Sequence, residues 1–211
     1  MSAPILQMPQ ASSSFTEGQL DQLISAKLDE MLPRKLAEIE ANKTPSMAII
    51  VTKGTLDWAY PPFILASTGA ALGWDVSLFF TFYGLELLKK DLSSLKVSPL
   101  GNPAMPMKMP MGPEWFREIS WNIPNLVQAA IPGYESIATA LMKKTIKNVG
   151  VVDISELRQL CLEADVKMVA CQMTVDLFGY ERDLFIPEVQ DYIGAASFLP
   201  TAQKSDVNLF I

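Results

Sequence analysis

The apolar run at residues 47–51, Met-Ala-Ile-Ile-Val, does most to limit what this chain can fold into. It has the length of a strand, it does not alternate between apolar and polar residues, and it leads into a turn at Gly54. Such a run buries both faces of its strand, as a central strand of a parallel sheet does. Residues 76–82 and 166–170 are also of strand length, and helical patterns lie between the three runs. This alternation predicts a three-layer α/β/α domain with a mainly parallel sheet.

The other expected elements follow the same order along the chain. Helices are expected from residue 58 to a turn at Gly73 and at residues 84–95, 134–148 and 153–164, with a closing edge strand at residues 207–211. Parallel strands end at one rim of the sheet, and ligands bind there.

The uncharged stretch at residues 58–85 has an alternative interpretation as one or two membrane spans, because Asp75 is its single charge. The part from Trp58 to Trp74 is about 17 residues long, which is the lower limit for a span. It also contains Pro61 and Pro62. We therefore favour a helix and a strand in the core of an acidic globular domain.

The N-terminal part differs in composition from the rest of the chain. Residues 1–14 are predicted to be a disordered lead-in, and residues 15–46 a helical extension with its linker. Thr16 and Gln19 have the spacing of a capping box, and apolar residues then recur at helical spacing past Pro33. This apolar stripe needs either the parent domain or another subunit to pack on, which favours a homo-oligomer. Residues 47–211 are the expected α/β domain.

Charge and composition exclude several classes of function. The chain has a formal net charge of −6 and no concentrated basic run, so we expect no nucleic-acid partner. It contains no histidine, which removes Ser-His and Cys-His pairs and the commonest zinc ligand. Two cysteines in a chain of this length do not form a disulfide scaffold, and the N-terminus lacks a signal-peptide pattern, so a cytoplasmic location is expected.

Cys171 directly follows the strand-like run at residues 166–170 and precedes a helical segment closed by Gly179. At a helix start, free N–H groups favour thiolate over thiol, which makes Cys171 a candidate nucleophile. The alternative is that it is a small buried hydrophobe. Cys161 lies on the apolar side of the helix expected at residues 153–164, where a packed core residue is the favoured interpretation and a second reactive thiol the alternative.

Residues 97–131 form an insertion with many prolines, so no helix runs through its first part. Its methionines alternate strictly, which places four thioethers on one side of an extended segment. Such a row is either an adaptable apolar lid or a soft-ligand row for Cu(I), and we favour the lid because Cys and His are absent from the loop. The candidate substrate-binding or lid residues are Gly54, Thr81, Tyr83, Gly84, Met105, Met107, Met109, Met111, Gln172, Met173 and Thr174.

Six short segments together give the chain a resemblance to a known family. They are residues 79–84 (FFTFYG), 99–102 (PLGN), the methionine-proline loop, 142–144 (MKK), 170–174 (ACQMT) and 207–211 (VNLFI). In order and spacing, from about residue 47 to residue 211, the chain resembles the longer branch of the DsrE-like family.

This resemblance implies a flavodoxin-like fold, oligomeric assembly, and a cysteine, Cys171, that carries sulfur as a persulfide or as bound thiosulfate. It also implies exchange with TusA-like or rhodanese-like sulfur carrier proteins. A sulfur carrier or sulfurtransferase is therefore the leading hypothesis, with catalytic turnover and stoichiometric relay both open. The alternative is a Cu(I)-binding or redox-sensing thiol protein without turnover. We expect no cofactor and no resident metal, and we expect at most peripheral membrane contact through residues 105–121.

Overall fold

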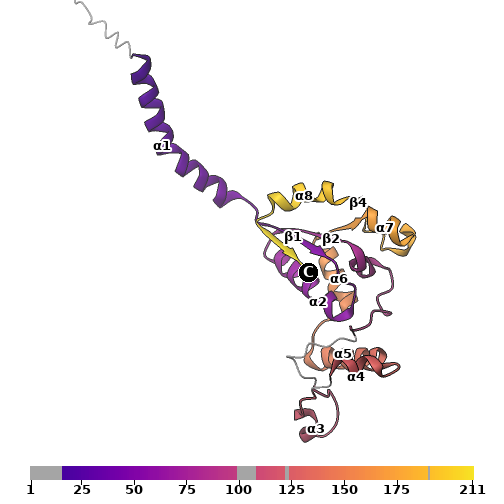
Figure 1. Cartoon of the computed structure of the whole chain (residues 1–211). Helices are drawn as coiled ribbons and strands as arrows, with labels where there is room; N and C mark the ends of the chain where they lie inside the picture. Colours follow the sequence, from indigo (N-terminus) through magenta and orange to yellow (C-terminus); the bar gives the residue numbers. More distant parts are fainter. Residues whose placement is uncertain (1–15, 99–107, 122–123, 190) are drawn as a thin grey trace, which may run out of the picture. The chain divides into compact units, whose positions relative to one another are not determined.

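The computed structural model describes residues 16–98, 108–121, 124–189 and 191–211 (Figure 1). The chain divides into two compact units, Met1–Lys43 and Thr44–Ile211. Helix α1, Glu17–Asn42, forms the described part of the first unit, and no residue of it is buried. Gln19 Oε1 accepts the backbone N–H of Thr16 at 3.1 Å, as the predicted capping box requires. The lead-in predicted at residues 1–14 lies outside the described residues.

The second unit is built on a five-stranded sheet with the strand order β4-β3-β2-β1-β5. Every neighbouring pair is parallel. Along β1, Ile49 and Val51 face one layer of the core while Ala48 faces the other, which explains why this run does not alternate. The strands are β1 Ser46–Val51, β2 Asp75–Phe80, β3 Lys167–Cys171, β4 Asp191–Ile193 and β5 Val207–Phe210.

Helices cover both faces of this sheet. On one face, Phe63 of α2 and Leu157 of α6 are buried against the sheet together with Phe80 of β2. On the other face, Phe198 of α8 stacks on Phe79 of β2 with ring centroids 4.6 Å apart. The domain therefore has the predicted three-layer, flavodoxin-like α/β/α fold. The helical elements are α2 Leu56–Ala71, η1 Phe82–Leu88, α3 Glu114–Glu118, α4 Asn125–Ala130, α5 Tyr134–Val149, α6 Ile154–Glu163, α7 Gln172–Phe178, η2 Arg182–Leu184 and α8 Ala195–Lys204.

The prediction of a helix at residues 84–95 is wrong. The chain forms the short 3₁₀ helix η1 and then continues irregularly. Leu85, Leu87 and Leu88 are all buried, and these three positions do not fall on one side of an α-helix. Arg158 of α6 donates to the backbone carbonyl oxygens of Leu87 and Lys89 at 3.0 and 2.6 Å and so replaces the missing helical hydrogen bonds.

The uncharged stretch at residues 58–85 forms α2, β2 and the start of η1. None of the helices that the structure describes is long and apolar enough to cross a membrane. One strand was not predicted. β4 has only three residues, and it pairs with the end of β3.

Candidate functional site at the end of strand β3

Cys171 is the last residue of β3 and the N-cap of α7, so it lies at the predicted turn from strand to helix. Only 2% of its surface is exposed. It lies opposite Ile193 of β4 and packs with Phe79, Val169 and Phe198 on the α8 side of the sheet. An apolar environment of this kind normally favours the neutral thiol.

Two hydroxyl groups lie beside this thiol. Thr174 is buried in the first turn of α7, and its Oγ1 is 3.1 Å from the Oγ1 of Thr81, which directly follows β2. The backbone N–H of Phe82 donates to Thr174 Oγ1 at 3.4 Å. Phe82 makes this contact with a φ of 49°, a left-handed conformation that an aromatic residue rarely adopts. The turn after β2 is thereby directed at α7.

The pKa of Cys171 is lowered from its ordinary value. Burial would raise the pKa of this thiol, but hydrogen bonds from the hydroxyl and backbone of Thr174, the hydroxyl of Thr81 and the backbone of Met173 outweigh burial. All of these donors are neutral. α7 has only seven residues, so these local donors rather than a long helix dipole stabilise the thiolate. Such a sulfur is suited to act both as a nucleophile and as a leaving group.

Gly54 and Gly84 lie at the predicted rim, where they allow two backbone segments to approach closely. A Cβ atom on Gly84 would lie 2.2 Å from the carbonyl oxygen of Val51, and one on Gly54 would lie 2.0 Å from that of Tyr83. Both positions therefore exclude any side chain. The contact fixes the turn after β1 against the turn after β2 and so holds Thr81 in place.

The side chains of Gln172, Met173 and Tyr83 are not among the groups that hydrogen-bond to the sulfur. Gln172 is held on the surface because its Nε2 donates to Asp176 at 2.7 Å and its Oε1 accepts from Arg182 at 2.9 Å. Met173 and Tyr83 are both about two-thirds exposed. Both side chains therefore lie on the surface, while the backbone of Met173 is hydrogen-bonded to the Cys171 sulfur.

Cys161 lies on the sheet-facing side of α6, as its helical spacing predicts. It is fully buried, and its Sγ donates to the carbonyl oxygen of Phe63 at 3.4 Å. Burial raises the pKa of this thiol to about 11. Both cysteines are free.

Only half of the methionine row can be located. Met105 and Met107 lie outside the described residues, while Met109 and Met111 lie in a bend directly before α3. The carbonyl oxygen of Pro110 accepts from Asn148 of α5 at 3.1 Å. Figure 1 shows α3 and α5 at the end of the domain away from α7. The structure does not bring Met109 and Met111 to Cys171.

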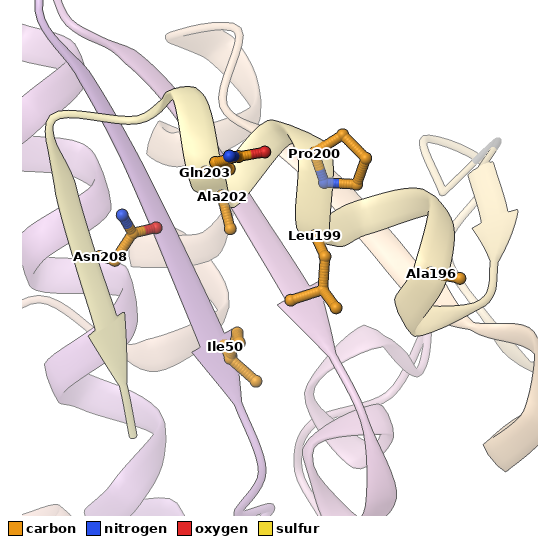
Figure 2. A pocket seen from close by; sticks show the side chains of 7 residues that line it. All are labelled: Ile50, Ala196, Leu199, Pro200, Ala202, Gln203 and Asn208. Carbon is orange, nitrogen blue, oxygen red and sulfur yellow. The ribbon is translucent and has the colours of Figure 1, made fainter.

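A hollow of about 520 Å³ lies between α8 and strands β1 and β5 (Figure 2). Figure 2 shows Leu199 of α8 and Ile50 of β1 on its two sides. No titratable or nucleophilic side chain lines it, so we do not assign chemistry to it. Its lining residues are Ile50, Ala196, Leu199, Pro200, Ala202, Gln203 and Asn208.

The sequence did not indicate two features of the site. One is the backbone N–H of Phe82, because no local pattern predicts a left-handed aromatic residue. The other is the cover over Cys171 from Phe198 and Ile193, which comes from the unpredicted pairing of β4 and the helix that follows it.

Comparisons with known proteins agree with this architecture. The chain is 56% identical over 165 residues to a protein of Allochromatium vinosum named sulfur carrier protein DsrE2, covering 78% of this chain and 97% of that protein. It is 27% identical over 169 residues to a protein of Bacillus subtilis named uncharacterized protein YrkE, covering 80% of this chain and 98% of that one. Residues 43–210 match the DsrE/DsrF/DrsH-like family. The chain therefore belongs to the DsrE/DsrF/DrsH-like family.

Proposed function

We propose that this protein is a sulfur carrier that holds sulfane sulfur on Cys171. The observation that supports this most strongly is the lowered pKa of a cysteine that is almost completely buried, caused by neutral donors around its sulfur. The name of the Allochromatium relative, sulfur carrier protein DsrE2, agrees with this role.

Loading requires no change in the overall oxidation state. The Cys171 thiolate attacks the outer sulfur of a donor persulfide, a new S–S bond forms, and the S–S bond of the donor breaks. The electron pair leaves with the donor thiolate. The product is a persulfide on Cys171, and once its outer S–H releases the proton to water it is a perthiolate with one negative charge, as the thiolate had. Donors from Thr81, Thr174 and Met173 can therefore serve both states.

Delivery is the reverse reaction with a different partner. An acceptor thiolate attacks the outer sulfur, and Cys171 leaves as a thiolate. A lowered pKa makes it the better leaving group. We propose a TusA-like or rhodanese-like carrier as that partner. The exposed apolar side chains of Phe82, Tyr83 and Met173 flank the site and offer a contact surface for it.

Mass spectrometry after incubation with polysulfide tests the proposal. We expect a reductant-labile addition of sulfur on the peptide that contains Cys171, and transfer of this sulfur to an added acceptor protein. A parallel incubation with tetrathionate, which transfers a thiosulfonate group to a thiolate and releases thiosulfate, distinguishes a persulfide from a thiosulfonate adduct by mass. Protein that takes up no sulfur but binds Cu(I) stoichiometrically would contradict the proposal in favour of the thioether-site hypothesis.

A further inference from the structure

The groups that hydrogen-bond to the Cys171 sulfur come from two elements that are far apart in the sequence. Thr81 directly precedes η1, whereas Met173 and Thr174 belong to α7. Both elements are short, with seven residues each, and helices shorter than about 12–15 residues are only marginally stable on their own. The positions of these groups therefore depend on what holds α7 against η1.

Tyr180 joins the C-terminal end of α7 to η1. Its phenolic hydroxyl donates to Oε1 of Glu86 in η1 at 2.6 Å, across 94 positions of the sequence. The Nζ of Lys89 lies 2.7 Å from the same oxygen. The backbone N–H of Tyr180 donates to the carbonyl oxygen of Val175, so Tyr180 is itself fixed to α7. Hydrogen bonds to a carboxylate are about twice as strong as those between neutral groups, so this contact is a strong link between two short elements.

The network of Tyr180, Glu86 and Lys89 is partly shielded from solvent. The side chains of Glu86 and Lys89 are 29% and 27% exposed. The ring of Tyr180 packs edge-on against the buried Phe185, with ring centroids 5.9 Å apart, and Lys89 Nζ lies 4.6 Å from the centroid of Tyr180. A Cβ atom on Gly54 would lie 2.9 Å from Glu86 Cβ, so the turn after β1 packs behind this side chain. A partly buried pair of this kind is screened less than an exposed one.

Tyr180 and Lys89 keep their protons over the range in which Cys171 titrates. The hydrogen bond to Glu86 and burial raise the pKa of Tyr180 above its ordinary value. Burial lowers the pKa of Lys89, but the hydrogen bond and the charge of Glu86 outweigh burial and raise it. Both groups ordinarily titrate at about pH 10, whereas the pKa of the Cys171 thiol is lowered. A titration of Cys171 therefore leaves the hydroxyl and the ammonium group of the network unchanged.

We propose that Tyr180 is a positioning residue for Cys171, which holds α7 against η1 through Glu86 and thereby keeps the groups of both elements directed at the sulfur. Its own hydroxyl bonds to Glu86 and not to the sulfur. The inference rests on the sulfur-carrier proposal for its functional meaning, because a carrier thiol must be held as a thiolate in order to be loaded. The competing role for the same contact is that of a lid, in which α7 lifts away to uncover Cys171.

The rate of iodoacetamide reaction with Cys171, measured against pH in the full-length protein, distinguishes these roles. In Tyr180→Phe we expect the midpoint of the profile to rise by about half a pH unit, so that reaction at neutral pH slows about threefold. The rate on the alkaline plateau should stay unchanged, because access to the sulfur is the same. Tyr192→Phe is the matched control. The ring of Tyr192 packs on the same Phe185, with centroids 6.2 Å apart, but its hydroxyl does not bond to Glu86, so the profile should not shift.

Variants of Glu86 test whether the effect runs through this contact. Glu86→Gln retains an oxygen for the tyrosine hydroxyl and should shift the profile less than Glu86→Ala does. Tyr180→Phe combined with Glu86→Ala should shift it no further than Glu86→Ala alone, because both changes break one contact. Additive shifts or an unshifted profile of Tyr180→Phe would overturn the proposal. Faster reaction of Tyr180→Phe across the whole pH range would overturn it in favour of a lid.

The alkylation profiles do not require sulfur uptake, so the two proposals can fail separately. Unmodified protein that takes up no sulfur from polysulfide would contradict the sulfur-carrier proposal and leave the positioning role of Tyr180 intact. Protein that loads normally but has an unshifted Tyr180→Phe profile would contradict the positioning role alone.

Discussion

Cys171 and Cys161 are ten residues apart and are almost equally hidden, with 2% and 0% of their surfaces exposed, yet the pKa values of their thiols shift in opposite directions. Cys161 donates to the carbonyl oxygen of Phe63, which stabilises the neutral thiol. Cys171 instead receives hydrogen bonds from Thr81, Thr174 and the backbone of α7. Burial raises the pKa of both thiols, but the hydrogen bonds around Cys171 outweigh this effect, whereas the backbone hydrogen bond from Ser67 does not offset it at Cys161.

Replacing the two cysteines in turn is the largest test of this contrast. We expect Cys171→Ser to abolish sulfur uptake from polysulfide, because the only activated thiol is gone. Cys161→Ser should load to the same extent as the unmodified protein. Peptide mapping by mass spectrometry measures both. An adduct on Cys161 would contradict the proposal that Cys171 is the reactive thiol.

Gly84→Ala should disturb Cys171 without altering Cys161. The added Cβ would lie 2.2 Å from the Val51 carbonyl oxygen, so β1 and the turn after β2 must separate. Forced packing of this kind costs about 1–3 kcal/mol of unfolding free energy. The midpoint of urea unfolding should decrease, and so should the alkylation rate of Cys171. Gly194→Ala, where nothing lies within 4 Å of the added atom, is the matched control and should change neither.

Thr174→Val removes one hydroxyl and retains the shape of the side chain. The pKa of Cys171 should rise, because a lowered pKa reflects stabilisation of the thiolate and the largest stabilising hydrogen bond is lost. A rise of one pKa unit slows alkylation at neutral pH by about tenfold. The pH dependence of iodoacetamide reaction should shift to higher pH, and Thr174→Ser should reverse the shift. An unshifted profile would mean that Thr174 does not set the pKa.

The smallest effect concerns the pH dependence that Cys161 gives to stability. The pKa of Cys161 is raised to about 11 in the folded protein. Its contribution to the free energy of unfolding is therefore fully present below the pKa of the unfolded chain, near 9, and is lost as the pH rises through the pKa of the folded protein. At pH 10 the loss is about 1 kcal/mol relative to neutral pH. Urea unfolding of the unmodified protein and of Cys161→Ala should therefore converge by this amount between pH 7 and pH 10. A constant difference would contradict the raised pKa.

The sequence predicted those parts of the fold that depend on burial over a whole element. β1 is a continuous apolar run, β3 is apolar and buried after Lys167, and α6 has one buried apolar side, so their types follow from local patterns. β4 could not be predicted, because its three residues form a strand only by pairing with β3. The irregular chain after η1 could not be predicted either, since it depends on Arg158 reaching across from α6.

The candidate site was predicted in outline and not in detail. A cysteine between a strand and a helix indicated Cys171 as the candidate reactive group, and the structure has it at that turn. Which of the rim residues contact the sulfur depends on the left-handed backbone of Phe82 and on the close approach at Gly84, and neither follows from composition or spacing. Thr81 and Thr174 were therefore named together with residues such as Gln172, whose side chain bonds to Asp176 and Arg182 instead.

The position of β5 has a consequence for the order of folding. β5 pairs with β1, and the turn after β1 is held by Ile211, whose carbonyl oxygen accepts both the backbone N–H and the Oγ1 of Thr52, across 159 positions of the sequence. Contacts between such distant positions form late, because the loop they close has a high entropic cost. Until β5 is in place, β1 is an edge strand, and its apolar residues are open to pairing with other chains. We therefore expect the alignment of Gly54 with Tyr83, and with it the environment of Cys171, to be completed among the last steps of folding.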